Sequence, residues 1–486
     1  MKVKIKMNEN MTLLDALRTR NARTANGALT NSTSLSSCLD YFFVAGLHRE
    51  DTQSFAKAFA ENPDIALKIL FWSRDVRGGS GARATFDAVM KELQNEDAAL
   101  FSKLFKYIPE FGYWKEIFKL KPTAELVDFV VDTLNKEDDH SLCAKYCPRK
   151  GWWFSEIRKA TGLDQKELRK QLVARTQVVE NLMCENKWSE IAYEQVPSVA
   201  GLRYRKLFYK HDEERYGSYI ESVNKGETKI NSSVLYPHNI YEEYLKNRRG
   251  SLTKMPELEA MWNGLPNFME GCKERILPLC DVSGSMTGTP MAISVALGCY
   301  ISQHNEGIFK DAFMTFESRP QLCYLKGDSI ISRFNQLENA EWGGSTDLQA
   351  AFDLILRTAT KNHIAESEMP TKLLIISDMQ FDSATGGNGT YDWNTGRWVY
   401  NDNDNTNYEV IKQKYADAGY KLPEIIFWNV NGPAGDLPVT MRDLGTGLVS
   451  GYSPSILTSI LKGEVKTPYQ LMLDTVDTER YKEIHV

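Results

Sequence analysis

The sequence Ile276–Met286, ILPLCDVSGSM, is a short apolar run followed directly by a loop of oxygen-bearing side chains. The run has the length of a buried strand, although Pro278 is awkward there because proline cannot donate to a β-ladder. In the loop, Asp281, Ser283 and Ser285 stand two residues apart and can point at one centre. Carboxylate and hydroxyl oxygens are hard ligands that suit Mg²⁺.

The rest of the C-terminal half alternates apolar runs of strand length with helical patterns. Besides 276–280, the runs are 312–316, 373–377 and 425–430, and the helical patterns are 291–303, 348–360, 408–419 and 454–461. Such alternation predicts an α/β domain with a doubly wound parallel sheet. Ligands of these sheets bind beyond the carboxyl ends of the strands.

Two further loops at that edge carry suitable oxygens. Thr346 lies in GGSTDL just before a helical pattern, and Asp378 directly follows the apolar run 373–377. Each of these residues alone fits an ordinary helix cap or turn. Mg²⁺ needs six oxygens in an octahedron, which one loop cannot supply. Together with the first loop, these two residues give five oxygen ligands on three loops.

The motifs DVSGSM, GGSTDL and LLIISDMQFD resemble the metal-ion-dependent adhesion site of von Willebrand factor A domains. The resemblance implies a Rossmann-like domain and a bound Mg²⁺ or Mn²⁺. The implied metal ligands are Asp281, Ser283, Ser285, Thr346 and Asp378. It also implies that water or a carboxylate of a protein partner takes the sixth position.

The N-terminal half has a different period, with apolar residues at helical spacing from about 13 to 244. Examples are 56–72, 84–104, 124–134, 166–183 and 204–223, separated by short Gly-, Pro- or Asn-containing breaks. We therefore expect an α-solenoid or an irregular array of helices with HEAT-like packing. The predicted domains are the helical array at 1–265, the A-like domain at 271–465, and a tail at 466–486 that packs back on the helices.

The charge is divided unevenly. The net charge is −6, but residues 1–270 are slightly basic and the remainder is acidic, which hints that the first half meets a polyanion. Basic residues cluster with aromatic ones, a combination that can bind phosphates and stack bases. The candidate RNA-binding residues are Arg74, Arg77, Arg83, Lys145, Arg149, Lys150, Arg203, Arg205 and Lys206. The alternative for each is a solvated helix surface or a local ion pair, for example with Asp75.

Segments 26–46, 73–86, 108–118 and 188–216 resemble the TROVE module of Ro-type ribonucleoproteins, and more closely its uncharacterised bacterial and phage relatives. The stretch RDVRGGSGAR is the best single match. The resemblance implies a ring of HEAT-like helices closed by a von Willebrand A domain. It also implies binding of single-stranded RNA ends and small structured RNAs, without DNA specificity.

Two other functions stay open. The chain could be a protein-interaction module whose cation engages an acidic residue of a partner, with no RNA. It could also be a metal-assisted nuclease, although the seven histidines are dispersed and no general base stands near the cation loops in sequence. We therefore expect a binding protein and not an enzyme.

The segment 383–405 follows a predicted ligand strand and contains Trp393 and Trp398 on either side of a plausible hairpin turn. We expect it to overhang the cation face, or else to pack on its own domain. No apolar run approaches the ~20 residues that cross a bilayer, and the eight cysteines are scattered. A cytoplasmic protein with reduced thiols, away from membranes, is expected.

Overall fold

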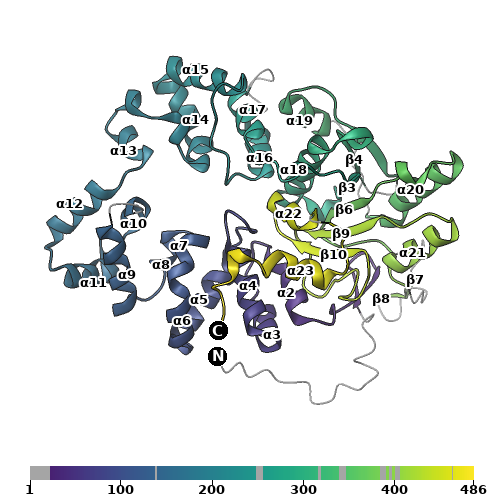
Figure 1. The fold of residues 1–486 in the computed structure, drawn as a ribbon, viewed down its shortest axis with the longest axis horizontal. Helices are drawn as coiled ribbons and strands as arrows, with labels where there is room; N and C mark the ends of the chain where they lie inside the picture. The colour runs from purple at the N-terminus through teal and green to yellow at the C-terminus, as the bar shows by residue number, and fades with distance from the viewer. Residues whose placement is uncertain are drawn as a thin grey trace.

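The helices of the N-terminal half form an arc that begins and ends at a β-sheet built by the C-terminal half (Figure 1). The computed structural model describes residues 22–136, 140–247, 255–315, 319–338, 346–383, 390–392, 397–399, 405–461 and 463–486. Within these residues no helix is long and apolar enough to cross a membrane. The order of helices and strands confirms the expected combination of a helical array and an α/β half.

The N-terminal half opens with a small antiparallel hairpin, β1 (Ala22–Arg23) and β2 (Leu29–Thr30), and continues as short helices. These are α2 (Ser37–Ala45), α3 (Thr52–Glu61), α4 (Pro63–Arg74), α5 (Ala84–Glu96), α6 (Ala98–Leu104), α7 (Ile108–Phe111), α8 (Trp114–Ile117), α9 (Ala124–Asn135), α10 (His140–Tyr146), α11 (Gly151–Thr161), α12 (Gln165–Arg175), α13 (Val179–Cys184), α14 (Ser198–His211), α15 (Glu213–Asn224), α16 (Pro237–Asn247) and α17 (Pro256–Asn263).

Several predicted helices are broken in two by a capping residue. Asn62 ends α3, and its side chain accepts a hydrogen bond from the Ile65 amide at the start of α4. Asp97 does the same between α5 and α6, with the Leu100 amide. A short polar side chain satisfies the free N–H groups of a new helix, so it can interrupt a continuous apolar pattern.

The C-terminal half contains a six-stranded sheet in the order β10-β9-β6-β3-β4-β5. Its strands are β3 (Ile276–Cys280), β4 (Ala312–Thr315), β5 (Gln321–Tyr324), β6 (Lys372–Ser377), β9 (Glu424–Asn429) and β10 (Thr446–Ser450), and its helices are α18 (Thr289–His304), α19 (Ile330–Glu338), α20 (Leu348–Lys361), α21 (Asn407–Asp417) and α22 (Leu457–Ile460). All neighbours are parallel except β4 and β5, which are antiparallel. The sheet is therefore mixed, which corrects the prediction of a purely parallel one.

Pro278 lies in the central strand without disrupting it. Residues 276–280 of β3 pair along their whole length with β6, whereas pairing with β4 begins only at Leu279. Successive residues of a strand direct their backbone N–H groups to opposite neighbouring strands. The Asp281 amide donates to the Ile376 carbonyl of β6, so the backbone at position 278 is directed toward β4, at a point where the β3–β4 ladder has not yet begun. The missing N–H of proline therefore removes no ladder bond.

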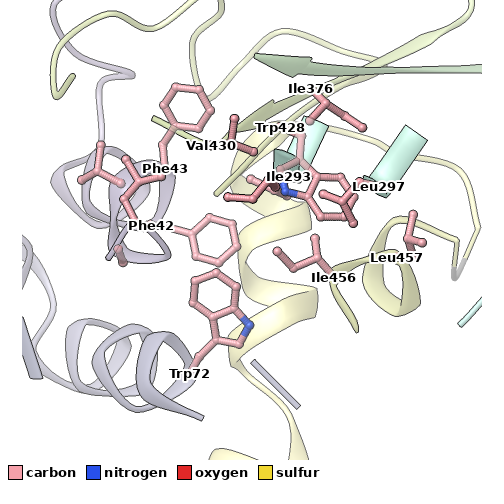
Figure 2. Packing of buried hydrophobic residues seen from close by; sticks show 14 of the residues in the cluster. Phe42, Phe43, Trp72, Ile293, Leu297, Ile376, Trp428, Val430, Ile456 and Leu457 are labelled. Carbon is pink, nitrogen blue, oxygen red and sulfur yellow. The ribbon is translucent and has the colours of Figure 1, made fainter. Parts of the chain in front are cut away.

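The two halves share one hydrophobic core. Figure 2 shows Phe42 and Trp72, from α2 and α4, packed near Trp428 of β9 and Ile456. The rings of Phe42 and Trp72 lie 4.6 Å apart. At the other end of the arc, α16 packs on α18 and α17 on α19. Both ends of the arc are thus held by the sheet half.

The C-terminal tail returns to the helical half. Helix α23 (Pro468–Val476) contacts α2, α4 and β10. Beyond it, the Arg480 guanidinium pairs with the fully buried carboxylate of Asp75, which also accepts a bond from the Tyr481 hydroxyl at 3.0 Å. The glycine-rich stretch 75–83 and the tail are therefore joined.

Candidate cation and nucleic-acid sites

Four of the five predicted cation ligands lie together at the carboxyl ends of β3 and β6. The Asp281 carboxylate accepts the Ser283 amide at 2.9 Å and the Ser377 hydroxyl at 2.5 Å. The hydroxyls of Ser283 and Ser285 are 3.1 Å apart. Asp378 directly follows β6, and its charge is close enough to act on Asp281.

The two carboxylates at this edge are buried, and neither forms a salt bridge to a described residue. Asp281 is 0% exposed and Asp378 is 4% exposed. Burial, with the negative charge of Asp378 as a lesser cause, raises the pKa of Asp281 to about 6. Two buried negative groups without a cationic side chain are costly unless a cation joins them.

Thr346, the fifth predicted ligand, lies just before α20 and is fully buried. Its hydroxyl donates to the Gln380 carbonyl at 2.8 Å, and its amide donates to Asp382 at 3.1 Å. Thr346 therefore lies against the loop that begins at Asp378. No direct bond between Thr346 and Asp281, Ser283, Ser285 or Asp378 is found among the described residues.

The donor set fits a hard divalent cation. Within the described part of the chain, no three His, Cys, Asp or Glu side chains form a group that could hold a metal ion. The predicted site would instead combine two carboxylates with three hydroxyls, a set of oxygens that suits Mg²⁺. Ser285 and its neighbour Gly284 are exposed, so the site faces solvent on the β3 side.

The segment 383–405 can be followed only in part. Thr390–Asp392 (β7) and Arg397–Val399 (β8) pair in antiparallel register, as expected for a hairpin. Trp393, the turn residues and most of the flanking segment lie outside the described residues. Whether the segment overhangs the cation face stays a prediction.

The first group of RNA-binding candidates surrounds Glu116. Arg74 is fully buried and donates to Glu116 at 2.7 Å, with its guanidinium 5.1 Å from the Tyr113 ring. Arg83 is half exposed and lies 3.3 Å from the same carboxylate. Arg77 is exposed and donates to the Glu110 carbonyl at 2.6 Å.

Another of the candidates, Lys145, contacts Glu180 of α13. This carboxylate accepts bonds from Lys145 of α10 at 2.8 Å and from the Tyr204 hydroxyl of α14 at 3.2 Å. Arg169 of α12 donates to the Arg149 carbonyl at 3.2 Å. The helices α10 to α14 and their connections carry many exposed or partly exposed basic side chains, which we call together the α10–α14 basic surface. They include Lys145, Arg149, Lys150, Lys166, Arg169, Lys170, Arg203 and Lys206.

Two of the nine predicted RNA-binding residues are placed where they cannot reach a phosphate. Arg74 is 0% exposed and Arg205 is 6% exposed, and each is paired with a carboxylate: Arg205 bonds Glu243 at 2.7 Å. An arginine buried against its own glutamate is a structural ion pair. The prediction is wrong for these two and stays open for the other seven.

The comparisons with known proteins follow the same division of the chain. Residues 24–125 and 154–265 match the model of a domain of unknown function, DUF2828. Residues 275–484 match a second domain of unknown function, DUF7788. The second match includes the C-terminal tail.

One curated relative and one solved structure are similar along most of the chain. The uncharacterized protein L728 of Acanthamoeba polyphaga mimivirus is 26% identical over 515 residues, covering 93% of this chain and 87% of that protein. The crystal structure of the Deinococcus radiodurans RO (RSR) protein aligns with 89% of this chain and 100% of its own, at 13% identity and a TM-score of 0.37.

Sequence reasoning missed the hairpin β1–β2, which lies against the predicted cation ligand Thr346 at the carboxyl edge of the sheet. Thr24 donates to the Phe381 carbonyl at 2.7 Å, and the Asn26 amide donates to the Thr346 hydroxyl at 2.8 Å. Gly27 forms an antiparallel bridge with Asp382. The signal in the sequence is the Asn26-Gly27 pair, which is typical of a tight turn but says nothing of where the turn docks.

Proposed function

We propose that this protein is an RNA-binding scaffold in which the helical arc holds RNA and a cation-bearing sheet half closes the arc. The observation that carries the proposal is the α10–α14 basic surface with its exposed tryptophan. Trp152 is 58% exposed and lies two residues after Lys150, whereas its neighbour Trp153 is buried and donates to the Leu120 carbonyl. An exposed aromatic ring among basic side chains suits phosphates and unpaired bases together.

The Ro-type resemblance of segments 26–46, 73–86 and 188–216 supports RNA as the polyanion. The proposal includes HEAT-like packing of the helices in the arc. Binding through lysine and arginine would be electrostatic and mostly independent of sequence. Lys166, Arg169 and Lys170 are exposed on α12 and add cationic side chains to this surface.

The nucleic acid that copurifies with the full chain tests this proposal. The protein, purified at low salt, is expected to carry RNase-sensitive and DNase-resistant absorbance at 260 nm. Trp152→Ala combined with Lys150→Glu is expected to lose most of it. Lys361→Glu, an exposed charge reversal at the end of α20 in the sheet half, is the control and should retain it. Protein that is free of RNA at every stage would contradict the proposal.

We further propose that the sheet half is a von Willebrand A-like domain that holds Mg²⁺ through Asp281, Ser283, Ser285, Thr346 and Asp378. The cation would neutralise two buried carboxylates and offer a coordination position on the exposed Ser285 side to an acidic protein partner. Isothermal titration of the metal-free chain with Mg²⁺ measures this directly. The absence of heat, with no change in melting temperature, would exclude the site.

A further inference from the structure

The hairpin β1–β2 lies over the carboxyl edge of the sheet, where the loops after β6 and β9 emerge. On one side it contacts residues 380–382, and on the other Asn31 pairs with Leu437 through backbone bonds of 3.0 Å in both directions. The Ala25 amide also donates to the Gln380 side chain at 2.6 Å, and that side chain donates to Asp436 at 2.7 Å. The helical half thus reaches the proposed cation edge through residues 24–31.

Asn26 contacts a proposed metal ligand. Its amide group donates one hydrogen to the Thr346 hydroxyl at 2.8 Å and one to the Gln380 carbonyl at 2.6 Å. Asn26 itself is exposed, whereas Thr346 is fully buried. The contact is therefore made from the solvent side onto a residue of the edge.

The hydrogen-bonding capacity of a hydroxyl decides what this contact does. A hydroxyl has one hydrogen and two lone pairs. The hydrogen of Thr346 is directed to the Gln380 carbonyl at 2.8 Å, and the Asn26 amide takes one lone pair. One lone pair is left for a cation, and the proton is held away from it. Partners of this kind orient metal ligands and typically change metal affinity by about 10- to 100-fold when removed.

We infer that Asn26 is a positioning residue of the cation site, so that cation binding and docking of the N-terminal hairpin favour one another. This inference rests on the proposed Mg²⁺ site. The hairpin belongs to the helical half, so cation occupancy strengthens the closure between the arc and the sheet. Because coupling between two binding events is reciprocal, loosening the hairpin weakens the cation and removing the cation loosens the hairpin.

The test is isothermal titration of Mg²⁺ into the full chain and its variants. Asn26→Ala is expected to raise the Kd for Mg²⁺ about tenfold. Asn31→Ala is the matched control, since it removes an asparagine of the same hairpin that donates to Leu437 instead of Thr346. It removes one docking bond of the hairpin without touching Thr346, so it should raise the Kd much less than Asn26→Ala does. An equal rise in both variants would show general loosening of the hairpin and not positioning of Thr346. An unchanged Kd in Asn26→Ala, with Mg²⁺ still bound, would overturn the inference but leave the proposed cation site standing.

A double-mutant cycle separates positioning from general loosening. If Asn26 acts through the Thr346 hydroxyl, Asn26→Ala should have little further effect in a Thr346→Val background. Equal effects in both backgrounds would show that Asn26 acts elsewhere. Hydrogen exchange provides a second readout: Mg²⁺ should slow exchange of the amides at 24–31 in the wild type and not in Asn26→Ala. Failure of the wild type to bind Mg²⁺ would overturn both the site and the inference.

Discussion

At the scale of the residue, two buried carboxylates make the carboxyl edge of the sheet electrostatically unfavourable. Asp281 and Asp378 are both buried, and the negative charge of Asp378 acts on Asp281. Their hydrogen bonds come from neutral hydroxyl and amide groups. Neutral donors compensate a buried carboxylate only in part. A bound Mg²⁺ would attract both carboxylates. Removing the charge at position 281 should therefore have opposite effects on stability in the absence and in the presence of Mg²⁺.

Replacing Asp281 with asparagine should stabilise the metal-free protein and abolish its response to Mg²⁺. Burial raises the pKa of Asp281 to about 6 from an ordinary value of 3.8. Above pH 6 the folded protein therefore carries a disfavoured charge worth on the order of 2–3 kcal/mol. Urea unfolding at pH 7.5, with and without Mg²⁺, measures both effects.

Asp40→Asn is the matched control, because burial also raises the pKa of this carboxyl, which lies in α2 of the helical half and accepts bonds from Thr33 and Ser34. It should leave the Mg²⁺ response intact. A variant Asp281→Asn that still gains stability from Mg²⁺ would show that the cation binds elsewhere.

The two arginines around Glu116 look equivalent in sequence but not in structure. Removing Arg74 takes the buried partner from Glu116 and leaves the half-exposed Arg83, 3.3 Å away, so Arg74→Ala should cost about 3 kcal/mol of unfolding free energy. Arg83 is half exposed, so Arg83→Ala should cost at most about 1 kcal/mol. Urea midpoints compare the two. Similar losses in both variants would contradict the structural role given to Arg74.

The sequence shows which residues are basic but not which of them are buried. The pattern SRDVRGG gives no sign that Arg74 faces Glu116, 42 positions away. The pairing joins α4 to α8 across α7, which packs on both helices, and no local spacing in the sequence indicates it. For the same reason, the meeting of Asp281, Ser283, Ser285 and Asp378 at one sheet edge could be expected from their loops. The contact between Asn26 and Thr346, 320 positions apart, could not.

At the scale of the element, short strands and helices with strong apolar patterns were predicted to within a residue or two. The prediction 276–280 matches β3, and 348–360 matches α20 but for its last residue. Two strands of the six-stranded sheet were missed for different reasons. β10 contains Gly447 and Thr446 in a five-residue run, and β5 is an antiparallel edge strand without a buried face.

The glycine-rich loop after α4 is an element whose packing leaves no room for side chains. A Cβ at Gly79 would lie 1.9 Å from the Trp72 carbonyl oxygen. Gly79→Ala should therefore force the backbone apart and cost roughly 1–3 kcal/mol. Thermal unfolding measures the change.

Gly217→Ala provides the comparison, since Gly217 lies inside α15 and its added Cβ would meet only the Tyr209 ring, at 3.9 Å. Alanine there should stabilise the helix by up to about 1 kcal/mol. If Gly79→Ala were as well tolerated as Gly217→Ala, the loop would not be the tight junction described above.

At the scale of the whole molecule, aromatic residues from three distant segments meet where the arc joins the sheet. His48 follows α2 and stacks on Tyr452 at 4.3 Å, and His238 of α16 meets the edge of the same ring at 5.7 Å. Tyr452 follows β10. Both ends of the arc therefore contact the sheet half at one aromatic cluster.

The pH dependence of unfolding should report on this junction. Burial, helped by the charge of His48, lowers the pKa of His238 to about 3 from its ordinary 6.5. Below pH 6.5 His238 binds a proton in the unfolded chain but not in the folded one. The free energy of unfolding therefore decreases as the pH is lowered, by up to about 1.4 kcal/mol per pH unit for this group. Above pH 6.5 its contribution does not change.

Urea unfolding between pH 7.5 and 4.5 measures that slope. His238→Phe should reduce the loss of stability at low pH, whereas replacing the exposed terminal His485 with glutamine should leave it unchanged. Identical slopes in the wild type and His238→Phe would show that the junction does not exclude the proton.

The measurement that tests the central proposal most directly is RNA binding by the metal-loaded full chain. Fluorescence anisotropy of a labelled single-stranded RNA should show an affinity that falls steeply as salt rises. Trp152→Ala and a combined Lys150→Glu and Arg203→Glu variant should weaken binding, while Lys361→Glu binds as the wild type does. No binding at low salt, or binding unaffected by salt and by these variants, would contradict the account.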